Sequence, residues 1–188
     1  IMIDLAKTLI KLDSFLKENK IKYAIIGGTA AIMYGRLRAT EDIAVTLFVD
    51  LAEMDKVYEI VIKNFSPRLD NSLQFFKKNF VLPVNDVDTN IRIDFSAGLS
   101  EFDKNSINRR IRKKYGEVDI YVCSLEDLIL YKLFSARPID IIDVEELLKH
   151  PIQKIDVKYL TENASKFIEL LREDVLENLE KYLKYYKT

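Results

Sequence analysis

Two glycines and one aspartate have types and a spacing that could bind a phosphate chain together with a cation. Gly27 and Gly28 end a short apolar run, and Asp42 follows after a spacer of thirteen residues. Glycines at the end of a strand let backbone N–H groups approach a phosphate closely. An acidic residue on the next strand could then hold a divalent cation against those phosphates. Taken alone, the glycine pair more often marks a simple tight turn.

A second acidic residue, Asp94, lies in a segment that alternates like a strand. A period of two places Ile93 and Phe95 on one face, and Arg92 and Asp94 on the other. A carboxylate in an otherwise core-forming strand costs solvation free energy unless it is exposed, paired or bound to a metal. The segment is therefore either a half-exposed strand with a polar face or a strand that presents a metal ligand.

A third group of charged residues lies on two consecutive predicted helices. Lys132 interrupts a mostly apolar helical pattern, where a lysine either extends to solvent or meets an anion. Asp140 and Asp143 are three residues apart on one face of the next helix, near its start, where acidic residues are favoured. Each of these residues taken alone is more often structural.

Together the three segments resemble the nucleotidyltransferase superfamily, and within it the AbiEii-like and MenT-like toxin nucleotidyltransferases and their minimal relatives. The family motif joins a hydrophobic residue and a glycine pair to an Asp-hydrophobic-Asp or Asp-hydrophobic-Glu triplet. Here these are Ile26-Gly27-Gly28 and Asp42-Ile43-Ala44. The lead-in from Arg38 to Asp42 is similar to the family's Arg-x-Thr-x-Asp. Asp94 matches the third family carboxylate, and residues 124–143 match a later family segment.

This resemblance implies an Mg²⁺-dependent transfer of a nucleoside monophosphate from an NTP to a hydroxyl. The implied acceptors are RNA or tRNA, a protein or a small molecule, and the implied context includes a toxin–antitoxin system. Asp42 and Asp94 would hold the metal, and Lys132 would neutralise triphosphate charge as the third implied catalytic residue. The implied nucleotide-binding residues are Gly27, Gly28, Thr29, Arg38, Lys132 and Asp140.

Position 44 departs from the family pattern, because Ala44 stands where the resemblance requires the second carboxylate. Residues 42 and 44 share a strand face, whereas Glu41 points the other way and does not replace the missing ligand. With Asp42 and Asp94 alone, metal binding should be weaker and turnover greatly reduced. Ala44 is either a deliberate substitution that silences the enzyme or the natural residue of a degenerate member. The alternative function is therefore a non-catalytic nucleotide-binding or partner-binding module on the same fold.

An α+β arrangement is predicted to position these residues. It corresponds to the polymerase-β-like nucleotidyltransferase fold, with a small mixed sheet, flanking helices and a helical C-terminal extension. Periodicity predicts strands over residues 23–26, 42–49, 80–84, 91–95 and 118–122. It predicts helices over residues 3–19, 29–34, 51–64 and 139–149, and from residue 125 to a break at 137–138. The core is predicted to span residues 1–150, and the extension residues 151–188.

The charge balance limits the class of partner. The chain has 29 basic and 30 acidic residues, so any binding to nucleic acid requires a local basic patch. One dense cluster could contact RNA or tRNA phosphates, or form a solvated surface: Arg109, Arg110, Arg112, Lys113 and Lys114. Aromatic residues of the C-terminal helices indicate core packing or an interface with an antitoxin or a second copy of the chain, and packing is favoured for Tyr159 and Phe167.

Cysteine and hydropathy patterns exclude several other classes. Cys123 is the only cysteine, so a disulfide framework and a cysteine zinc site are excluded, and its apolar neighbours predict a buried residue. The sequence shows no signal-peptide pattern and no run of about 18 apolar residues, which predicts a cytoplasmic protein without a membrane partner. Asp86-Val87-Asp88 imitates a metal motif, but its turn-rich surroundings predict turn chemistry.

Overall fold

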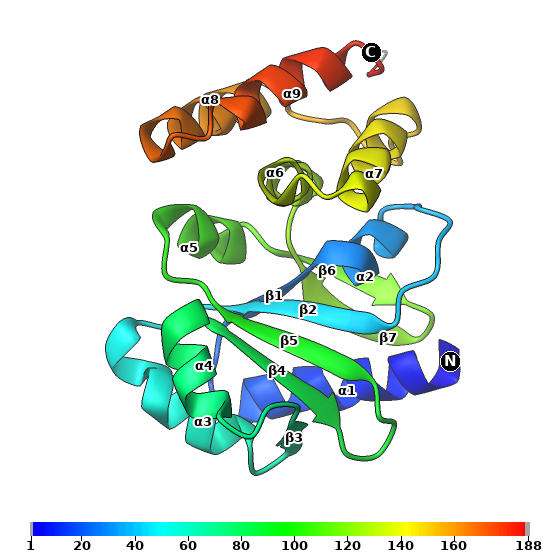
Figure 1. Cartoon of the computed structure of the whole chain (residues 1–188). Helices are drawn as coiled ribbons and strands as arrows, with labels where there is room; N and C mark the ends of the chain where they lie inside the picture. The colour runs from blue at the N-terminus through cyan, green and yellow to red at the C-terminus, as the bar shows by residue number, and fades with distance from the viewer. Residues whose placement is uncertain (1, 187–188) are drawn as a thin grey trace. The chain divides into compact units, whose positions relative to one another are not determined.

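The computed structural model of the chain describes residues 2–186 (Figure 1). Its backbone forms two compact units, and each is made of two stretches of the chain. The first, the sheet unit, comprises Ile1–Thr29 and Ala39–Cys123. The second, the helical unit, comprises Ala30–Arg38 and Ser124–Thr188.

Within the described residues, the sheet unit holds one seven-stranded mixed sheet in the order β3-β4-β5-β2-β1-β7-β6. The strands are β1 Tyr23–Ile26, β2 Asp42–Leu47, β3 Phe65–Pro67, β4 Val81–Asp86, β5 Arg92–Ala97, β6 Ile111–Tyr115 and β7 Val118–Val122. β2 runs parallel to β5, with Ala44 opposite Asp94. β1 runs antiparallel to β2, with Ile26 opposite Ala44. The three central strands therefore carry the predicted metal-site positions side by side.

Strict alternation explains why β2 and β5 form the centre of the sheet. Ile43 and Val45 of β2 and Phe95 of β5 are fully buried on one face. Phe65 packs edge-on against Phe95 with ring centroids 5.6 Å apart, and Phe15 of α1 packs edge-on against Phe65 at 5.1 Å. This apolar face is the core of the sheet unit, which leaves the opposite face of the same strands for polar residues.

Helices cover both faces of this sheet. The helices that lie wholly in the sheet unit are α1 Met2–Glu18, α3 Met54–Val61 with the 3-10 turn η1 Leu51–Glu53 before it, α4 Ser72–Asn79 and α5 Glu101–Asn108. Figure 1 shows α1 and α5 on opposite sides of the sheet, and α5 contacts β1 and β2. α1 forms because Leu5, Leu9, Leu12, Phe15 and Leu16 recur at helical spacing, and all five are buried.

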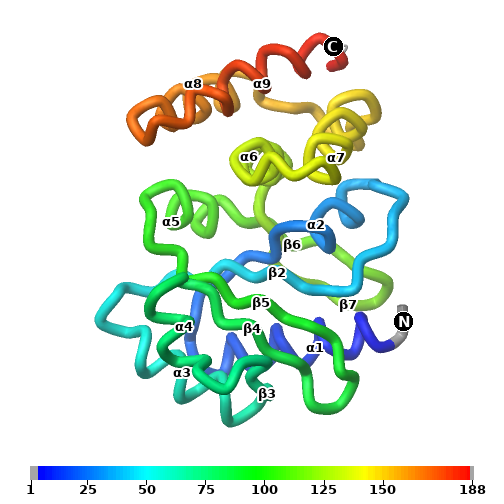
Figure 2. Tube along the Cα trace, in the orientation of Figure 1, coloured from blue at the N-terminus to red at the C-terminus, as the bar shows by residue number. Residues whose placement is uncertain are grey.

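α2 Gly27–Met33 starts directly at the end of β1, and its residues from Ala30 onward belong to the helical unit. The other elements of this unit are α6 Leu125–Ser135, α7 Pro138–Lys149, α8 Val157–Lys166, the 3-10 turn η2 Phe167–Leu170 and α9 Glu173–Leu183. Ser124 caps α6 by accepting the backbone N–H of Asp127, as its sequence position predicts. Pro138 opens α7, where its missing N–H costs nothing. α6 contacts α7, α8 and α9, and the path of these helices is visible in Figure 2.

Most predicted elements are present, and the differences are local. The structure adds α4, α5, β3 and β6, for which no prediction was made, so the sheet is larger than expected. The division after residue 150 stays a prediction, and the contacts of the described helices group the chain in another way. α6 and α7 bury their apolar faces against α8 and α9, so residues 124–149 group with the C-terminal helices.

Two smaller predictions are confirmed. Cys123 is buried. Asp86 ends β4 and accepts hydrogen bonds from the backbone N–H of Asp88 and the hydroxyl of Thr89, which is turn chemistry. Among the helices of residues 2–186, none is long and apolar enough to cross a membrane.

Candidate functional site

The backbone of the glycine pair lies directly against position 44. Gly27 has a φ of +67°, a left-handed conformation that strains residues with a side chain. An ideal Cβ built on Gly27 would lie 3.1 Å from the Cβ of Ala44, closer than ordinary van der Waals contact. Glycine is therefore required by both conformation and space. The first N–H groups of α2 start here, and the first four of any helix have no partner within it.

Two threonines hold Asp42 at the start of β2. The hydroxyl of Thr40 donates to the Oδ1 atom of Asp42 over 3.0 Å. The hydroxyl of Thr29 donates to the backbone oxygen of Asp42 over 3.1 Å, and the Thr29 side chain is fully buried. Thr29 therefore joins the start of α2 to β2. The carboxylate of Asp42 is fixed from one side and presented on the polar face of the sheet.

Asp94 lies across from Ala44 and forms an ion pair with Arg68. Arg68 follows β3, and its backbone N–H donates to the oxygen of Pro83 over 3.0 Å. Pro83 is the residue of β4 that lies opposite Asp94, so the Arg68 side chain reaches along the same row of the sheet. Burial raises the pKa of Asp94 above its ordinary value, the negative charge of Asp42 adds to this, and Arg68 opposes it only in part.

Arg68 has no pattern in the sequence that marks it as a site residue. It lies in an irregular stretch after Pro67, outside every segment that resembles the family. Its relation to Asp94 depends on how β3 and β4 pair, which is a tertiary feature. No local signal in the sequence could have identified it.

The side chains present fit a divalent cation that arrives with a nucleotide. Among the described residues, no cluster of three or more His, Cys, Asp or Glu could hold a metal by itself. Ala44 offers no donor atom, and the carboxylate of Glu41 instead meets Arg92 at 2.5 Å. Asp42 and Asp94 remain, on the same face of adjacent strands. Nucleotide-bound Mg²⁺ commonly takes one or two protein carboxylates, with phosphate and water oxygens completing the shell.

The helical unit contains a second group of predicted residues, centred on Lys132. This side chain is only 2% exposed, and its Nζ lies 3.0 Å from Asp140 and 2.7 Å from Asp143. Of the two interpretations of Lys132, the structure supports the one in which it meets an anion, and the anions are these two aspartates. Arg38, a predicted nucleotide-binding residue, also pairs with Asp143 at 2.7 Å, and Arg36 pairs with it at 2.9 Å.

Basic side chains dominate this cluster. Arg137 donates to Asp140 over 2.6 Å. Burial alone would raise the pKa of Asp140, but hydrogen bonds from Arg137 and Lys132 outweigh it and hold the pKa below its ordinary value. Asp140 is therefore an anion, and its ion pairs hold Lys132 and Arg137 in place. Arg36 was not identified from the sequence, because only the fold of residues 30–38 beside α7 reveals its partner.

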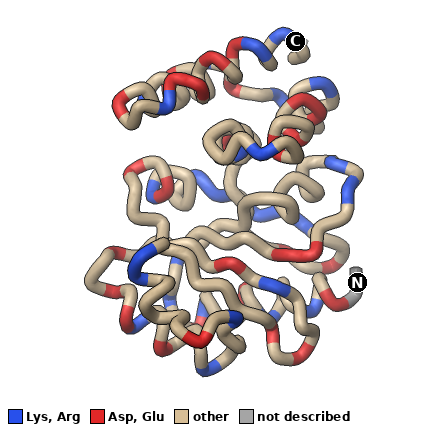
Figure 3. The backbone as a smooth tube through the Cα atoms, in the orientation of Figure 1, with Lys and Arg blue, Asp and Glu red and all other residues tan. Residues whose placement is uncertain are grey.

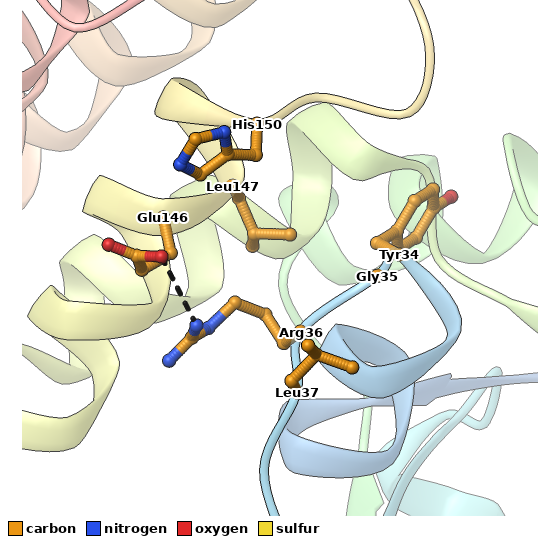
Figure 4. A pocket seen from close by; sticks show the side chains of 7 residues that line it. All are labelled: Tyr34, Gly35, Arg36, Leu37, Glu146, Leu147 and His150. Atoms are coloured by element: carbon orange, nitrogen blue, oxygen red, sulfur yellow. Dashed lines mark ion pairs between the residues drawn. The ribbon is translucent and has the colours of Figure 1, made fainter.

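A small pocket of about 180 Å³ lies beside this cluster in the helical unit (Figure 4). Its lining residues are Tyr34, Gly35, Arg36, Leu37, Glu146, Leu147 and His150. Arg36 extends toward Glu146, with 3.7 Å between the charged atoms. His150 ends α7, as its sequence position predicts.

The basic cluster of residues 109–114 lies mainly on β6, an edge strand of the sheet. Arg112 pairs with Asp119 at 2.9 Å, and the guanidiniums of Arg110 and Arg112 both lie over the Tyr121 ring. Two of the basic side chains of this cluster, Arg110 and Arg112, therefore already have partners within the protein. Basic and acidic positions are interspersed along the rest of the backbone (Figure 3).

Solved structures of nucleotidyltransferases share this fold. The antibiotic-resistance factor ANT(2'')-Ia is 15% identical, with a TM-score of 0.54 over 98% of this chain and 94% of that chain. An antigenic nucleotidyltransferase-like protein from Paracoccidioides brasiliensis is 16% identical, with a TM-score of 0.54 over 94% of this chain and 92% of that one. The lincosamide antibiotic adenylyltransferase LnuA is 15% identical, with a TM-score of 0.51 over 75% of this chain and 94% of that chain.

At such identities the likeness extends to the fold alone, and it confirms the predicted nucleotidyltransferase fold. No curated protein matches the chain. A match over residues 6–188 identifies the family, described as a nucleotidyltransferase of unknown function (DUF6036). The chain therefore belongs to this nucleotidyltransferase family.

Proposed function

We propose that the chain binds a nucleoside triphosphate with Mg²⁺ on the polar face of the sheet unit and transfers its monophosphate to a hydroxyl acceptor. The acceptor oxygen forms a bond to the α-phosphate, the α–β phosphoanhydride bond breaks, and pyrophosphate leaves. The close approach of Gly27 to Ala44, with Asp94 opposite Ala44 and Asp42 on the same strand, carries this proposal. It joins a side-chain-free backbone to two carboxylates on adjacent strands. Such an arrangement suits a phosphate chain and the cation that accompanies it.

Each residue would have a distinct part in this reaction. The backbone N–H groups of Gly27 and Gly28 would bind phosphate oxygens, and Thr29 would hold the start of α2 against β2. Asp42 and Asp94 would hold the Mg²⁺ ion. When bound, the ion supplies Lewis-acid activation of the α-phosphate and lowers the pKa of the acceptor hydroxyl.

Lys132, Asp140 and Arg38 stay predicted nucleotide-binding residues under this proposal. Within the helical unit, the ion pairs of Lys132 and Arg38 with Asp143, and of Arg137 with Asp140, hold these side chains in a fixed arrangement. Lys132 and Asp140 would therefore act by positioning Arg38 and its neighbours.

Ala44 would make this activity slow. The position points at the same face as Asp94 and lies under Gly27, so a carboxylate there would face the same cation. Its absence also favours a second candidate, a nucleotide-binding module without catalysis. The two candidates share the binding step and differ only in transfer.

The test compares the native chain with Ala44→Asp and with Asp42→Asn. Calorimetry with an NTP and Mg²⁺ should show binding to the native chain, about tenfold tighter binding to Ala44→Asp, and weaker binding to Asp42→Asn, because affinity follows the number of charged oxygen ligands. Labelled NTP is then offered with total RNA, tRNA, protein hydroxyls and hydroxylated small molecules. Label transfer by Ala44→Asp supports the enzyme.

The outcomes separate the candidates. Nucleotide binding without transfer to any acceptor class rejects the enzyme and leaves the binding module. An absence of Mg²⁺–NTP binding to every variant rejects both. Acceptor binding through RNA would use the basic cluster on β6 and should weaken steeply with salt. Binding of an antitoxin or a second copy of the chain would use the C-terminal helices α8 and α9.

A further inference from the structure

Arg68 has unused hydrogen-bonding capacity at the centre of the candidate site. A guanidinium carries five N–H donors in a planar fork. Within residues 2–186, Asp94 is the only hydrogen-bonding or ion-pair partner of the Arg68 side chain, which it contacts through one terminal nitrogen. The Arg68 and Asp94 side chains are 27% and 35% exposed, so the remaining donors are accessible to a ligand.

The position of Arg68 brings this capacity to the phosphate side of the sheet. Pro83, Asp94, Ala44 and Ile26 form one row across four neighbouring strands. Adjacent strands lie about 4.8 Å apart, so Asp94 is roughly two strand spacings from the residue that precedes Gly27. The phosphate chain of a nucleotide on the Gly27 backbone would span this distance.

The Arg68–Asp94 pair contributes little to folding. Ion pairs between partly exposed side chains stabilise a folded protein only weakly. The Arg68 backbone is held independently, through its N–H bond to Pro83. A stabilising role therefore does not account for a guanidinium at this place, and a ligand does.

We propose that Arg68 is a phosphate-binding residue that supplies a fixed positive charge to this site, so that a nucleoside triphosphate binds here without a divalent cation. One nitrogen of the fork holds Asp94 while the others bind phosphate oxygens. The inference rests on the proposed function, because the ligand is the same triphosphate. It assigns the binding step to a residue of the chain and leaves the divalent cation for the transfer step.

The experiment measures binding of the α,β-methylene analogue of ATP by calorimetry, first in excess EDTA and then in Mg²⁺. The variants are Arg68→Gln, Arg68→Lys and Asp94→Asn. The control is Arg172→Gln, which removes a guanidinium from the Arg172–Asp174 pair of the helical unit. That pair has a similar exposure, 29% and 44%. Circular dichroism and thermal melting confirm that each variant is folded.

In EDTA the native chain and Arg172→Gln should bind the analogue equally. Arg68→Gln should bind at least about tenfold more weakly, as expected for the loss of a hydrogen bond between charged groups. Arg68→Lys should lie between them, because it keeps the charge and loses the fork. Asp94→Asn should bind as tightly as the native chain or more tightly, since it releases the guanidinium and removes a repelling carboxylate.

Several results would overturn the inference. The first is that Arg68→Gln binds the analogue in EDTA as tightly as the native chain does. The second is that Asp94→Asn weakens binding as much as Arg68→Gln does, because this result would show that the two side chains act only as a structural pair. Binding of the native chain only in Mg²⁺ rejects the inference and leaves the proposed function standing. An absence of binding in both conditions rejects the proposed function, and the inference with it.

Discussion

At the scale of single residues, the candidate site depends on one glycine whose conformation and surroundings are both restrictive. Gly27 combines a positive φ with a backbone that lies against Ala44. Gly116, in the turn between β6 and β7, also has a positive φ, of 59°, but an added Cβ there would meet nothing within 4 Å. A comparison of alanine substitutions at the two glycines therefore separates the cost of the left-handed conformation from the cost of the added contact.

Gly27→Ala and Gly116→Ala should both destabilise the chain, and the first should do so more. Gly116→Ala adds only the cost of a left-handed alanine, about 1–2 kcal/mol. Gly27→Ala adds the same cost and a contact with Ala44, which must move by a few tenths of an ångström. Urea denaturation of the two variants measures the difference. Equal losses would show that the contact with Ala44 relaxes without cost.

The residue scale also shows where sequence reasoning succeeded and where it failed. The predicted strands that carry Asp42 and Asp94 are present as β2 and β5, and their pairing as neighbours was not predicted. Arg68 has no such pattern, because its partner is 26 residues away and is reached across β4. Local periodicity indicates which face a residue occupies, but it does not indicate which distant side chain extends over that face.

At the scale of elements, a cluster of side chains joins α1 to the turn between β4 and β5. Asp86 is buried at the end of β4, where Lys11 of α1 donates to it over 2.6 Å and Thr8 donates over 2.9 Å. Lys11 also meets Asp88 at 2.6 Å. Burial alone would raise the pKa of Asp86, but the hydrogen bonds from Lys11 and Thr8 hold it below its ordinary value. This cluster orients the hairpin that carries Asp94.

The stabilisation that the Asp86 carboxylate provides should be lost in acid. Its folded pKa lies below the ordinary value of 3.8, so its contribution is fully present above about pH 5. The contribution falls as the pH drops through 3.8 toward the folded pKa, because the unfolded chain takes up the proton first. Urea denaturation from neutral pH to about pH 3 measures this as the difference between the native chain and Asp86→Asn. A difference that does not change with pH would contradict the assignment.

One physical reason explains why α4, α5 and β6 were not predicted from the sequence. α4 and α5 contain many polar residues, and each buries only two side chains. β6 carries mostly charged residues and lies at the sheet edge, so it shows no apolar alternation. Such elements form because a neighbouring element provides a surface or a hydrogen-bonding edge, which a pattern within the segment does not reveal.

At the scale of the whole molecule, each of the two units is made of two separate stretches of the chain, so no single position in the sequence separates them. Residues 30–38 belong with the C-terminal helices, and residues 39–123 return to the sheet unit. The apolar side chains of the C-terminal helices are part of the core of the helical unit; the buried ones are Leu160, Ala164, Phe167, Val175, Leu179 and Tyr182. Residues 151–188 are therefore integral to that unit.

A chain that ends at residue 150 should have a disrupted helical unit. Each large buried apolar side chain is worth about 1.5–3 kcal/mol, so the loss of several approaches the 5–15 kcal/mol that stabilise an ordinary domain. The truncated chain should lose more helical circular dichroism than the removed residues account for, and should bind a hydrophobic dye. Cooperative melting at the temperature of the full chain would show instead that residues 1–150 fold independently.

The sequence by itself determined the α+β class, the central strands, the face of its strand that carries Asp42 and Ala44, and the face of its own strand that carries Asp94. These follow from periodicity and from glycine chemistry, which act over a few residues. Only the tertiary structure revealed the contact of Gly27 with Ala44, the reach of Arg68 to Asp94 and the ion pairs around Lys132. These contacts join distant residues, and their geometry exists only after the strands have paired and the helices have packed.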